Sequence, residues 1–210
     1  MQPNESLHLS VDCVLFGYDD DGLKVLLINQ KADTYAHEKG QPMSQLPGDL
    51  ILIEEGLDEA AERVLFELTQ VHGVYLKQFY AYGDPNRVKD HKDRAWLRSV
   101  RTLPDQRVVT VGYLGLVSLH DYDPQPASFA GGVSWVDVNE VGPLAFDHNS
   151  ILSGAIEALQ TQLESHHISF ELLPKKFTLS QLQALYETVL DKKFDKRNFR
   201  KNVKKMSHVV

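Results

Sequence analysis

The sequence predicts an α/β domain followed by a small all-α module of the helix-turn-helix type. Most of the chain alternates apolar, strand-like runs with amphipathic helical patterns at 57–70 and 149–167. The strand-like runs lie at 8–16, 23–28, 75–82, 107–119 and 134–138. The C-terminal part instead holds two short helical patterns, each preceded by capping residues.

The composition is that of an ordinary globular protein with one large or two small domains. The chain has 210 residues, 42% of them hydrophobic, which is enough to bury a sizeable core. Its one cysteine, Cys13, excludes an internal disulfide and a cysteine-based zinc set, and this favours a reducing compartment. The first residues lack a basic leader, and no apolar run approaches membrane length. We therefore expect a cytoplasmic protein with no membrane partner.

The net charge of −7 hides an asymmetry between an acidic body and a basic tail. Residues 173–210 hold ten lysines and arginines against three acids, Glu187, Asp191 and Asp195, whereas the rest holds 12 basic and 26 acidic residues. A basic segment on an acidic body is typical of a module that faces a polyanion. A merely solvated basic surface would give the same counts, so charge alone leaves both interpretations open.

One stretch carries the strongest motif: LPGDLILIEEGLDEAAERVLFELTQVHG. It resembles the signature of the Nudix family, G-x5-E-x7-R-E-U-x-E-E-x-G-U, in which U is a bulky apolar residue. With Asp49 at the motif glycine, Glu55 and Arg63 match the first glutamate and the arginine. Val64 and Leu68 then stand where the signature has glutamates.

A second register, with Gly48 at the motif glycine, does not restore the signature. Glu54 then matches the first glutamate, but Glu62 falls on the arginine and Arg63 on a glutamate. Of the closing pair of glutamates only Glu67 remains. The scaffold of the motif is thus present while most of its chemistry is missing. An ordinary amphipathic helix, unrelated to the family, is the remaining alternative.

The missing glutamates matter because magnesium prefers hard oxygen ligands in octahedral geometry. Residues 63, 64, 67 and 68 share one side of a helix, so we expect them to face one site. That side offers Arg63, Val64, Glu67 and Leu68, which can pack or bind an anion but suit cation clustering poorly. In the alternative of an active hydrolase, magnesium ligands would come from Glu54, Glu55, Glu59 and Glu67. We expect the helix to span 57–70, with Gly73 as a stop signal shortly after it.

Two other segments are candidates for the ligand pocket. Residues 86–106 form a long connection whose Arg94, Trp96, Arg98 and Arg101 would line a lid over an anionic ligand, or else belong to a plain polar loop. Asp147 and His148 are a weak metal pair, and a structural role at the pocket floor is the favoured interpretation. Asn149 is expected to cap the following helix, which we interpret as a rigid connector.

The first helix of the C-terminal module has a complete start signal. Thr178 suits the N-cap, Gln181 at N3 completes a capping box, and Phe177 can pack on Leu182 as a hydrophobic staple. Its inward stripe consists of Leu182, Leu185, Tyr186 and Val189.

The second helix repeats the same device, with Asp195 as N-cap and Phe194 stapled onto Phe199. Phe199, Val203 and Met206 form its inward face. The outward set comprises Lys196, Arg197, Asn198, Arg200, Lys201, Lys204 and Lys205. Arginine and asparagine at the start of a recognition helix read bases, and lysines contact phosphates. We therefore predict that this face binds DNA.

A degenerate Nudix motif, the run F-D-H before a connecting helix, then F-T-L-S-Q-L-Q-x-L-Y-E and D-K-R-N-F-R-K, together resemble the Nudix-related transcriptional regulators of the NrtR type. The resemblance covers almost the whole chain and implies an α/β/α sandwich at 1–148, a connector helix at 149–167 and a winged-helix module at 168–210. The wing is expected to be missing, because the sequence stops at Val210.

The resemblance also implies a function: a dimeric bacterial regulator that senses a small metabolite such as ADP-ribose or a sugar and binds operator DNA. It needs no cofactor; magnesium enters only in the alternative of an active Nudix hydrolase of ADP-ribose or another nucleoside diphosphate derivative. The residues that the resemblance places at the effector are Gly48, Arg63, Glu67, Asp84, Arg107, Phe146 and His148.

Overall fold

The structure is a computed structural model that describes residues 7–19, 21–29, 44–88, 106–119, 132–164 and 170–203. The strands are β1 His8–Asp19, β2 Gly22–Asn29, β3 Ser44–Gln45, β4 Gly48–Leu50, β5 Leu76–Tyr82, β6 Val108–Ser118 and β7 Gly132–Asp137. The helices are α1 Leu57–Thr69, α3 His148–Glu164, the 3-10 turn η1 Phe170–Leu172, α4 Leu179–Leu190 and α5 Lys196–Val203. No helix in these described ranges is long and apolar enough to cross a membrane.

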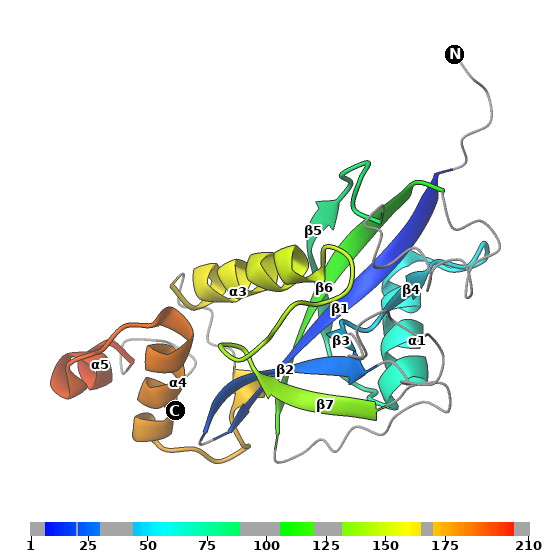
Figure 1. The fold of residues 1–210 in the computed structure, drawn as a ribbon. Helices are drawn as coiled ribbons and strands as arrows, with labels where there is room; N and C mark the ends of the chain where they lie inside the picture. Colours follow the sequence, from blue (N-terminus) through cyan, green and yellow to red (C-terminus); the bar gives the residue numbers. More distant parts are fainter. Residues whose placement is uncertain are drawn as a thin grey trace.

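The strands form one mixed sheet with the order β3-β2-β1-β6-β5. The central pair, β1 and β6, is parallel, while β4 pairs with β1 and β7 with β2 in antiparallel fashion. Helix α1 covers one face of the sheet and α3 the other (Figure 1). The predicted α/β/α sandwich is therefore confirmed.

Burial on both faces explains why β1 reads as a continuous apolar run. Cys13 and Leu15 belong to the core under α1, whereas Val14 and Phe16 belong to the core under α3. Successive side chains of a strand point to opposite faces, so a strand with two helical layers must be apolar throughout. Between Val11 and Phe16 one residue breaks this run, the buried Asp12, which is 5% exposed.

Helix α1 spans Leu57–Thr69, which confirms the helix predicted at 57–70. Its C-cap is Gln70, which takes the left-handed conformation with φ 60° and donates its backbone N–H to the carbonyl of Phe66. Gly73, the stop signal noted in the sequence, follows three residues later with φ 70°. A glutamine can close the helix because its side chain also donates to the Phe66 carbonyl.

Helix α3 begins at His148, and the expectation that Asn149 caps it was wrong. The Asn149 side chain accepts a hydrogen bond from the Leu144 N–H and donates one to the Gly142 carbonyl. It thus stabilises the preceding loop. The first turn closes instead on Asp147, whose carbonyl accepts from the N–H groups of Ser150 and Ile151.

The capping signals of α4 and α5 were predicted correctly. Thr178 and Gln181 form the reciprocal capping box, and Asp195 accepts the backbone N–H of Asn198. The rings of Phe194 and Phe199 lie 5.7 Å apart, in the contact expected of the staple.

The C-terminal helices share a core with the sheet. One apolar cluster runs from Phe16 on β1 through Leu159 on α3 to Leu185 on α4 and Phe199 on α5. Two polar contacts add to it: Gln160 donates to the Val189 carbonyl at 2.9 Å, and Lys192 pairs with Glu164 at 2.8 Å. Helix α3 is therefore a layer of the sandwich as well as a connection between the sheet and the C-terminal helices. The domain boundaries predicted from the sequence stay a prediction.

Candidate functional site

A buried ionic cluster joins the start of α3 to the central strand. Arg87 binds Asp147 through two hydrogen bonds, Nε to Oδ2 at 2.9 Å and Nη2 to Oδ1 at 2.8 Å. The same Nη2 contacts Oδ2 of Asp12 at 3.3 Å. The Arg87 side chain is 4% exposed and that of Asp12 7%. One guanidinium therefore links β1 to the N-terminus of α3 in a site almost free of water.

His148 completes this cluster. Its Nδ1 accepts the Leu46 N–H at 3.0 Å, which places the ring proton on Nε2, 3.4 Å from Oδ1 of Asp12. Gly48 lies against the same carboxylate, and a Cβ at this position would collide with Asp12 Oδ1. Glycine is required here because the backbone of β4 and the carboxylate approach so closely.

Two local conformations present these groups. Phe146 has φ 53°, a left-handed conformation that is uncommon for a bulky residue and that clusters at functional sites. Its ring lies 5.3 Å from that of His148. Before Arg87, Asp84 accepts the Asn86 N–H through its side chain and the Arg87 N–H through its carbonyl. Arg107 donates to the Gly83 carbonyl beside this turn.

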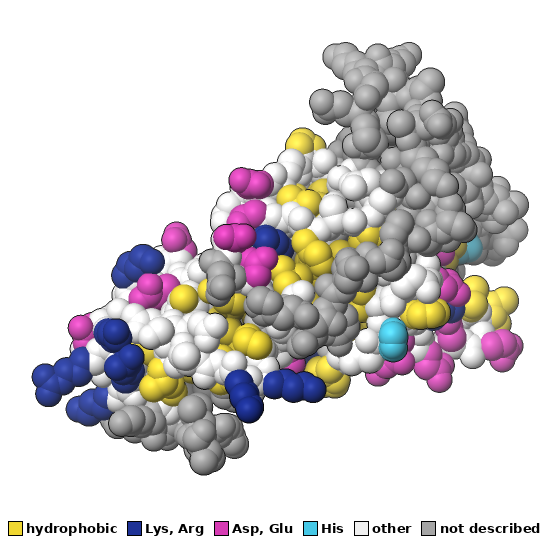
Figure 2. All heavy atoms as spheres, turned by 90° about the horizontal axis from the view of Figure 1, so that it is seen from below, with side chains coloured by type: hydrophobic (Ala, Val, Ile, Leu, Met, Phe, Trp, Pro, Cys, Tyr) yellow, Lys and Arg dark blue, Asp and Glu magenta, His cyan; other side chains and the backbone are white. Residues whose placement is uncertain are grey.

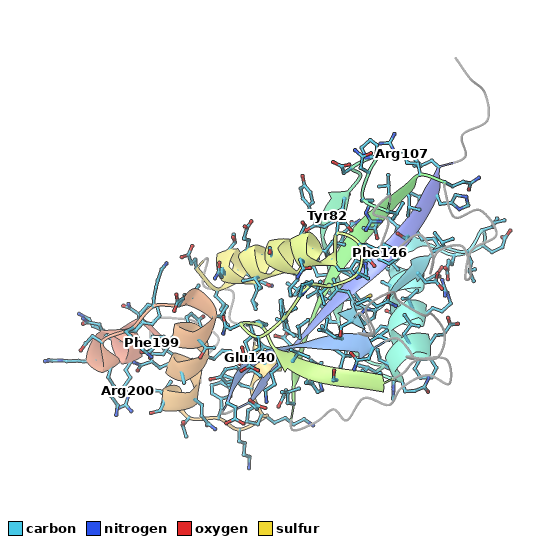
Figure 3. The ribbon with its side chains drawn as sticks, viewed as in Figure 1. Tyr82, Arg107, Glu140, Phe146, Phe199 and Arg200 are labelled. Atoms are coloured by element: carbon cyan, nitrogen blue, oxygen red, sulfur yellow. The ribbon has the colours of Figure 1, made fainter. Side chains whose placement is uncertain are left out.

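The predicted effector residues divide into two groups in space. Gly48, Asp84, Arg107, Phe146 and His148 surround or support the Arg87 cluster. Figure 3 shows Arg107, Phe146 and Tyr82 toward one end of the sheet, far from Phe199 and Arg200 on the C-terminal helix. Arg63 and Glu67 lie on α1, connected to the first group through β4, because Arg63 donates to the Leu50 carbonyl.

Arg63 holds the motif loop onto α1. Its Nε and Nη2 bind both oxygens of Glu55, at 2.8 and 2.5 Å, and Nη1 reaches Glu67 at 3.1 Å. Glu55 also accepts the Leu52 N–H. The hydrogen bonds that Arg63 donates lower the pKa of Glu55 to about 2, and the same bonds raise the pKa of Arg63. This pair is the structural half of the motif, and it is intact.

The expectation that residues 63, 64, 67 and 68 face one site was wrong. Val64 is 0% exposed and Leu68 8%, and both pack in the core between α1 and the sheet, whereas Glu67 is exposed. Val64 and Leu68 pack against the sheet because burial of each apolar side chain is favourable by about 1.5–3 kcal/mol. The charged members turn toward the motif loop.

The described residues do not fit a magnesium ion at the motif. Glu55 is engaged by Arg63, and the positions of two further glutamates hold buried apolar side chains. Within the described ranges, no group of three histidine, cysteine, aspartate or glutamate side chains is placed to hold a metal. Magnesium needs several oxygen ligands at once, and the described part of the motif does not offer them.

The second candidate site is the outer face of α5. Phe199 and Val203 are buried, while the five outward residues in the described range are all exposed: Lys196, Arg197, Asn198, Arg200 and Lys201. Lys204 and Lys205, predicted to extend this face, lie outside the described residues, as does Met206. Lysine and arginine side chains gather at this end of the molecule, whereas acidic ones are spread over the whole of the face in view (Figure 2).

The angle between α4 and α5 is fixed by hydrogen bonds in the turn. Glu187 accepts the Phe194 N–H at 3.0 Å and Gln183 Nε2 at 2.8 Å, and it pairs with Lys193. These contacts lower the pKa of Glu187 to about 2, so the carboxylate is ionised at any physiological pH. Gln183 also donates to the Phe194 carbonyl. The turn therefore presents the basic face in one orientation.

Comparisons with known proteins agree with this division. Residues 169–210 match the NrtR DNA-binding winged helix domain. The structure is similar to that of Shewanella oneidensis NrtR, with a TM-score of 0.71 and 32% identity over 94% of this chain and 85% of that one. The Acinetobacter baylyi protein described as an ADPR responsive transcriptional repressor, NtrR, is 28% identical over 93% of this chain and 71% of the relative.

Two further structures of the Shewanella protein show its ligands. One contains a 27mer DNA, with 28% identity, a TM-score of 0.67 and coverage of 94% of this chain and 82% of that one. The other is its NUDIX domain with ADP ribose, with 30% identity, a TM-score of 0.57 and coverage of 74% and 90%. The fold and sites define a Nudix-fold domain fused to a DNA-binding helix-turn-helix module. The chain belongs to the NrtR family of Nudix-related transcriptional regulators.

Sequence reasoning missed Asp12 and Arg87. Arg87 begins the long connection, of which residues 89–105, with Arg94, Trp96, Arg98 and Arg101, lie outside the described residues. Asp12 gave a signal that could have been used, because an acid within an apolar strand must find a partner when it is buried. Its partners are 75 and 136 residues away along the chain, so the sequence alone could not name them.

Proposed function

We propose that this protein is a metabolite-responsive transcriptional repressor. Its Nudix domain binds ADP-ribose or a related nucleoside diphosphate derivative, its α4–α5 module binds operator DNA, and occupancy of the first site lowers affinity at the second. The observation that carries the proposal is the exposed face of α5, where five basic or base-reading side chains surround two buried apolar anchors. Such segregation of faces is what a recognition helix needs.

The effector end of the molecule supports the sensing half of the proposal. The Arg87 cluster lies where the motif strand β4, the central strand β1 and the start of α3 meet. We propose that Gly48, Asp84, Arg107, Phe146 and His148 line or support the effector site there. Arg63 and Glu67 hold the adjacent loop. In the Shewanella relative, the NUDIX domain is the part crystallised with ADP ribose.

The motif favours a protein that binds its effector without hydrolysing it. The buried Val64 and Leu68 leave the motif without the carboxylates that would position magnesium against a diphosphate. A bound effector that is not cleaved can report its own concentration. We further propose that the protein acts as a homodimer in the cytoplasm, because two modules are needed to read paired half-sites.

Thermal shift with a panel of ligands tests the sensing half directly. A ligand that binds only the folded protein stabilises it by RT ln(1 + [L]/Kd). ADP-ribose should raise the melting temperature in a concentration-dependent way, and ribose or AMP alone should do so less at equal concentration. Absence of any shift with ADP-ribose, other nucleoside diphosphate sugars and free sugars would remove the sensing half of the proposal.

A further inference from the structure

A continuous groove runs between the edge strand β5 and helix α3. It consists of two adjoining cavities of about 550 and about 440 Å³, which share Phe79, Ala158 and Thr161. In the described sheet β5 pairs only with β6, so its other side is an edge. The helix wall is a single stripe at helical spacing: Ser150, Ser153, Gly154, Glu157, Ala158 and Thr161.

The helix wall of the groove is built mostly from small residues. Gly154 lets the Tyr82 hydroxyl approach the helix backbone, and a Cβ at this position would collide with it. Burial raises the pKa of Tyr82 to about 12, so its hydroxyl stays neutral under the floor of the groove. Small residues on a helix permit another protein surface to come close.

An aromatic side chain projects beside this hollow. Tyr80 is 64% exposed and stacks edge-on against Tyr82 at 5.1 Å. A β-bulge between Gln78 and Tyr80 interrupts the register of β5 with β6. Bulges disfavour a continuous strand-to-strand ladder at an edge. Packing of side chains into the groove is therefore favoured over extension of the sheet.

We infer that this groove is the contact between two copies of the chain. A two-fold contact uses the same patch on both subunits, so the patch must be complementary to itself. Here an exposed knob, Tyr80, lies next to a hollow of about 550 Å³ that can receive a partner's Tyr80. The exposed Lys77 lines one cavity and the exposed Glu157 the other, so a two-fold axis can pair each with its opposite on the partner.

This contact rests on the proposed function, which requires two copies of the chain. It adds where the two copies meet. Helix α3, which forms one wall of the groove, also packs against α4. Pairing along α3 would therefore fix the separation of the two α5 helices, and this separation sets the spacing of the half-sites that they read.

Two charge-reversal variants test the contact, because mixing them should restore the dimer that each variant alone weakens. Light scattering at micromolar concentration should give wild-type protein the mass of two chains. Lys77→Glu and Glu157→Lys each turn two attractive pairs into repulsive ones and should weaken dimerisation about tenfold or more. An equimolar mixture of the two variants restores both pairs and should regain the dimer mass. Tyr80→Ala should weaken the dimer as well.

Matched controls carry the same charge changes elsewhere on the surface. Lys176→Glu and Glu140→Lys alter exposed residues away from the groove and should leave the mass unchanged. Monomeric wild-type protein, or single variants that keep the dimer mass, would overturn the inference, as would a mixture that stays monomeric. DNA binding by the same samples separates the two proposals. A wild-type dimer that ignores DNA contradicts the proposed function, whereas single variants that remain dimeric and DNA-binding contradict only this contact.

Discussion

Arg87 clamps Asp147 with two parallel hydrogen bonds of 2.8 and 2.9 Å, across 60 residues of sequence. Asp147 closes the first turn of α3, and α3 carries the helices that we propose bind DNA. A bidentate pair of this kind fixes orientation as well as adding energy. An effector that shifts Arg87 would therefore act directly on the position of α3.

Arg87→Met tests the weight of this clamp. Removal of one partner leaves buried charge without compensation and should cost about 3–5 kcal/mol of the free energy of unfolding. The matched control is Lys24→Met, because Lys24 and Asp19 are each 22% exposed in their side chains and such pairs contribute about 0–1 kcal/mol. Urea unfolding measures both. Equal, small losses in the two variants would show that the cluster does not hold α3.

Glu55→Gln tests whether the motif survives as a structural clamp. The pKa of Glu55 is lowered from 4.5 to about 2, so its ionised form stabilises the fold above the usual pKa. This contribution should fade as the pH falls from about 4.5 toward about 2. The stability difference between wild type and variant, followed by urea unfolding against pH, should shrink in that window. Glu54→Gln makes the same change at an exposed neighbour and is the matched control.

Hydrolysis of ADP-ribose with millimolar magnesium should be negligible, because Val64 and Leu68 cannot ligate a cation. Turnover of about 1 per second or above, within the ordinary enzyme range, would favour the hydrolase instead. Introduction of glutamates at these two positions is not a useful rescue. Both side chains are buried under the sheet, so Val64→Glu with Leu68→Glu should unfold the domain rather than restore metal binding.

Residues on α5 should divide into base readers and phosphate contacts. Arg197→Ala and Asn198→Ala alter the exposed first turn and should each relax sequence preference by about 1–3 kcal/mol. Lys201→Ala should weaken all sequences alike and reduce the slope of log K against log salt by about one unit. Competition binding with matched and scrambled duplexes distinguishes the two effects. An identical loss on all duplexes for Arg197 and Asn198 would assign them to phosphates.

The features predicted best from the sequence are those determined by residues close together along the chain. The caps of α4 and α5 follow from residues three positions apart, and the structure has them as expected. Asn149 misled because its side chain could serve either the helix behind it or the loop before it, and tertiary packing chose the loop. Asp12 and Arg87 could not be paired from sequence, since their meeting depends on the order of strands in the sheet.

The sequence also did not predict which residues of the motif helix face the sheet. Spacing placed residues 63, 64, 67 and 68 on one side, which is correct for a helix, but not which part of that side meets the sheet. The contrast between the apolar pair and the charged pair was the available clue. Val64 and Leu68 pack inward while Arg63 serves the loop.

In the proposed function, one chain couples metabolite binding to DNA binding. Fluorescence anisotropy of the intact protein on duplexes from its own genomic neighbourhood, with and without ADP-ribose, tests it most directly. Binding should be salt-sensitive, and ADP-ribose should weaken it by about 5–150-fold, the range of ordinary allosteric coupling. DNA binding that saturating ADP-ribose leaves unchanged, or no binding to any of these duplexes at low salt, would contradict it.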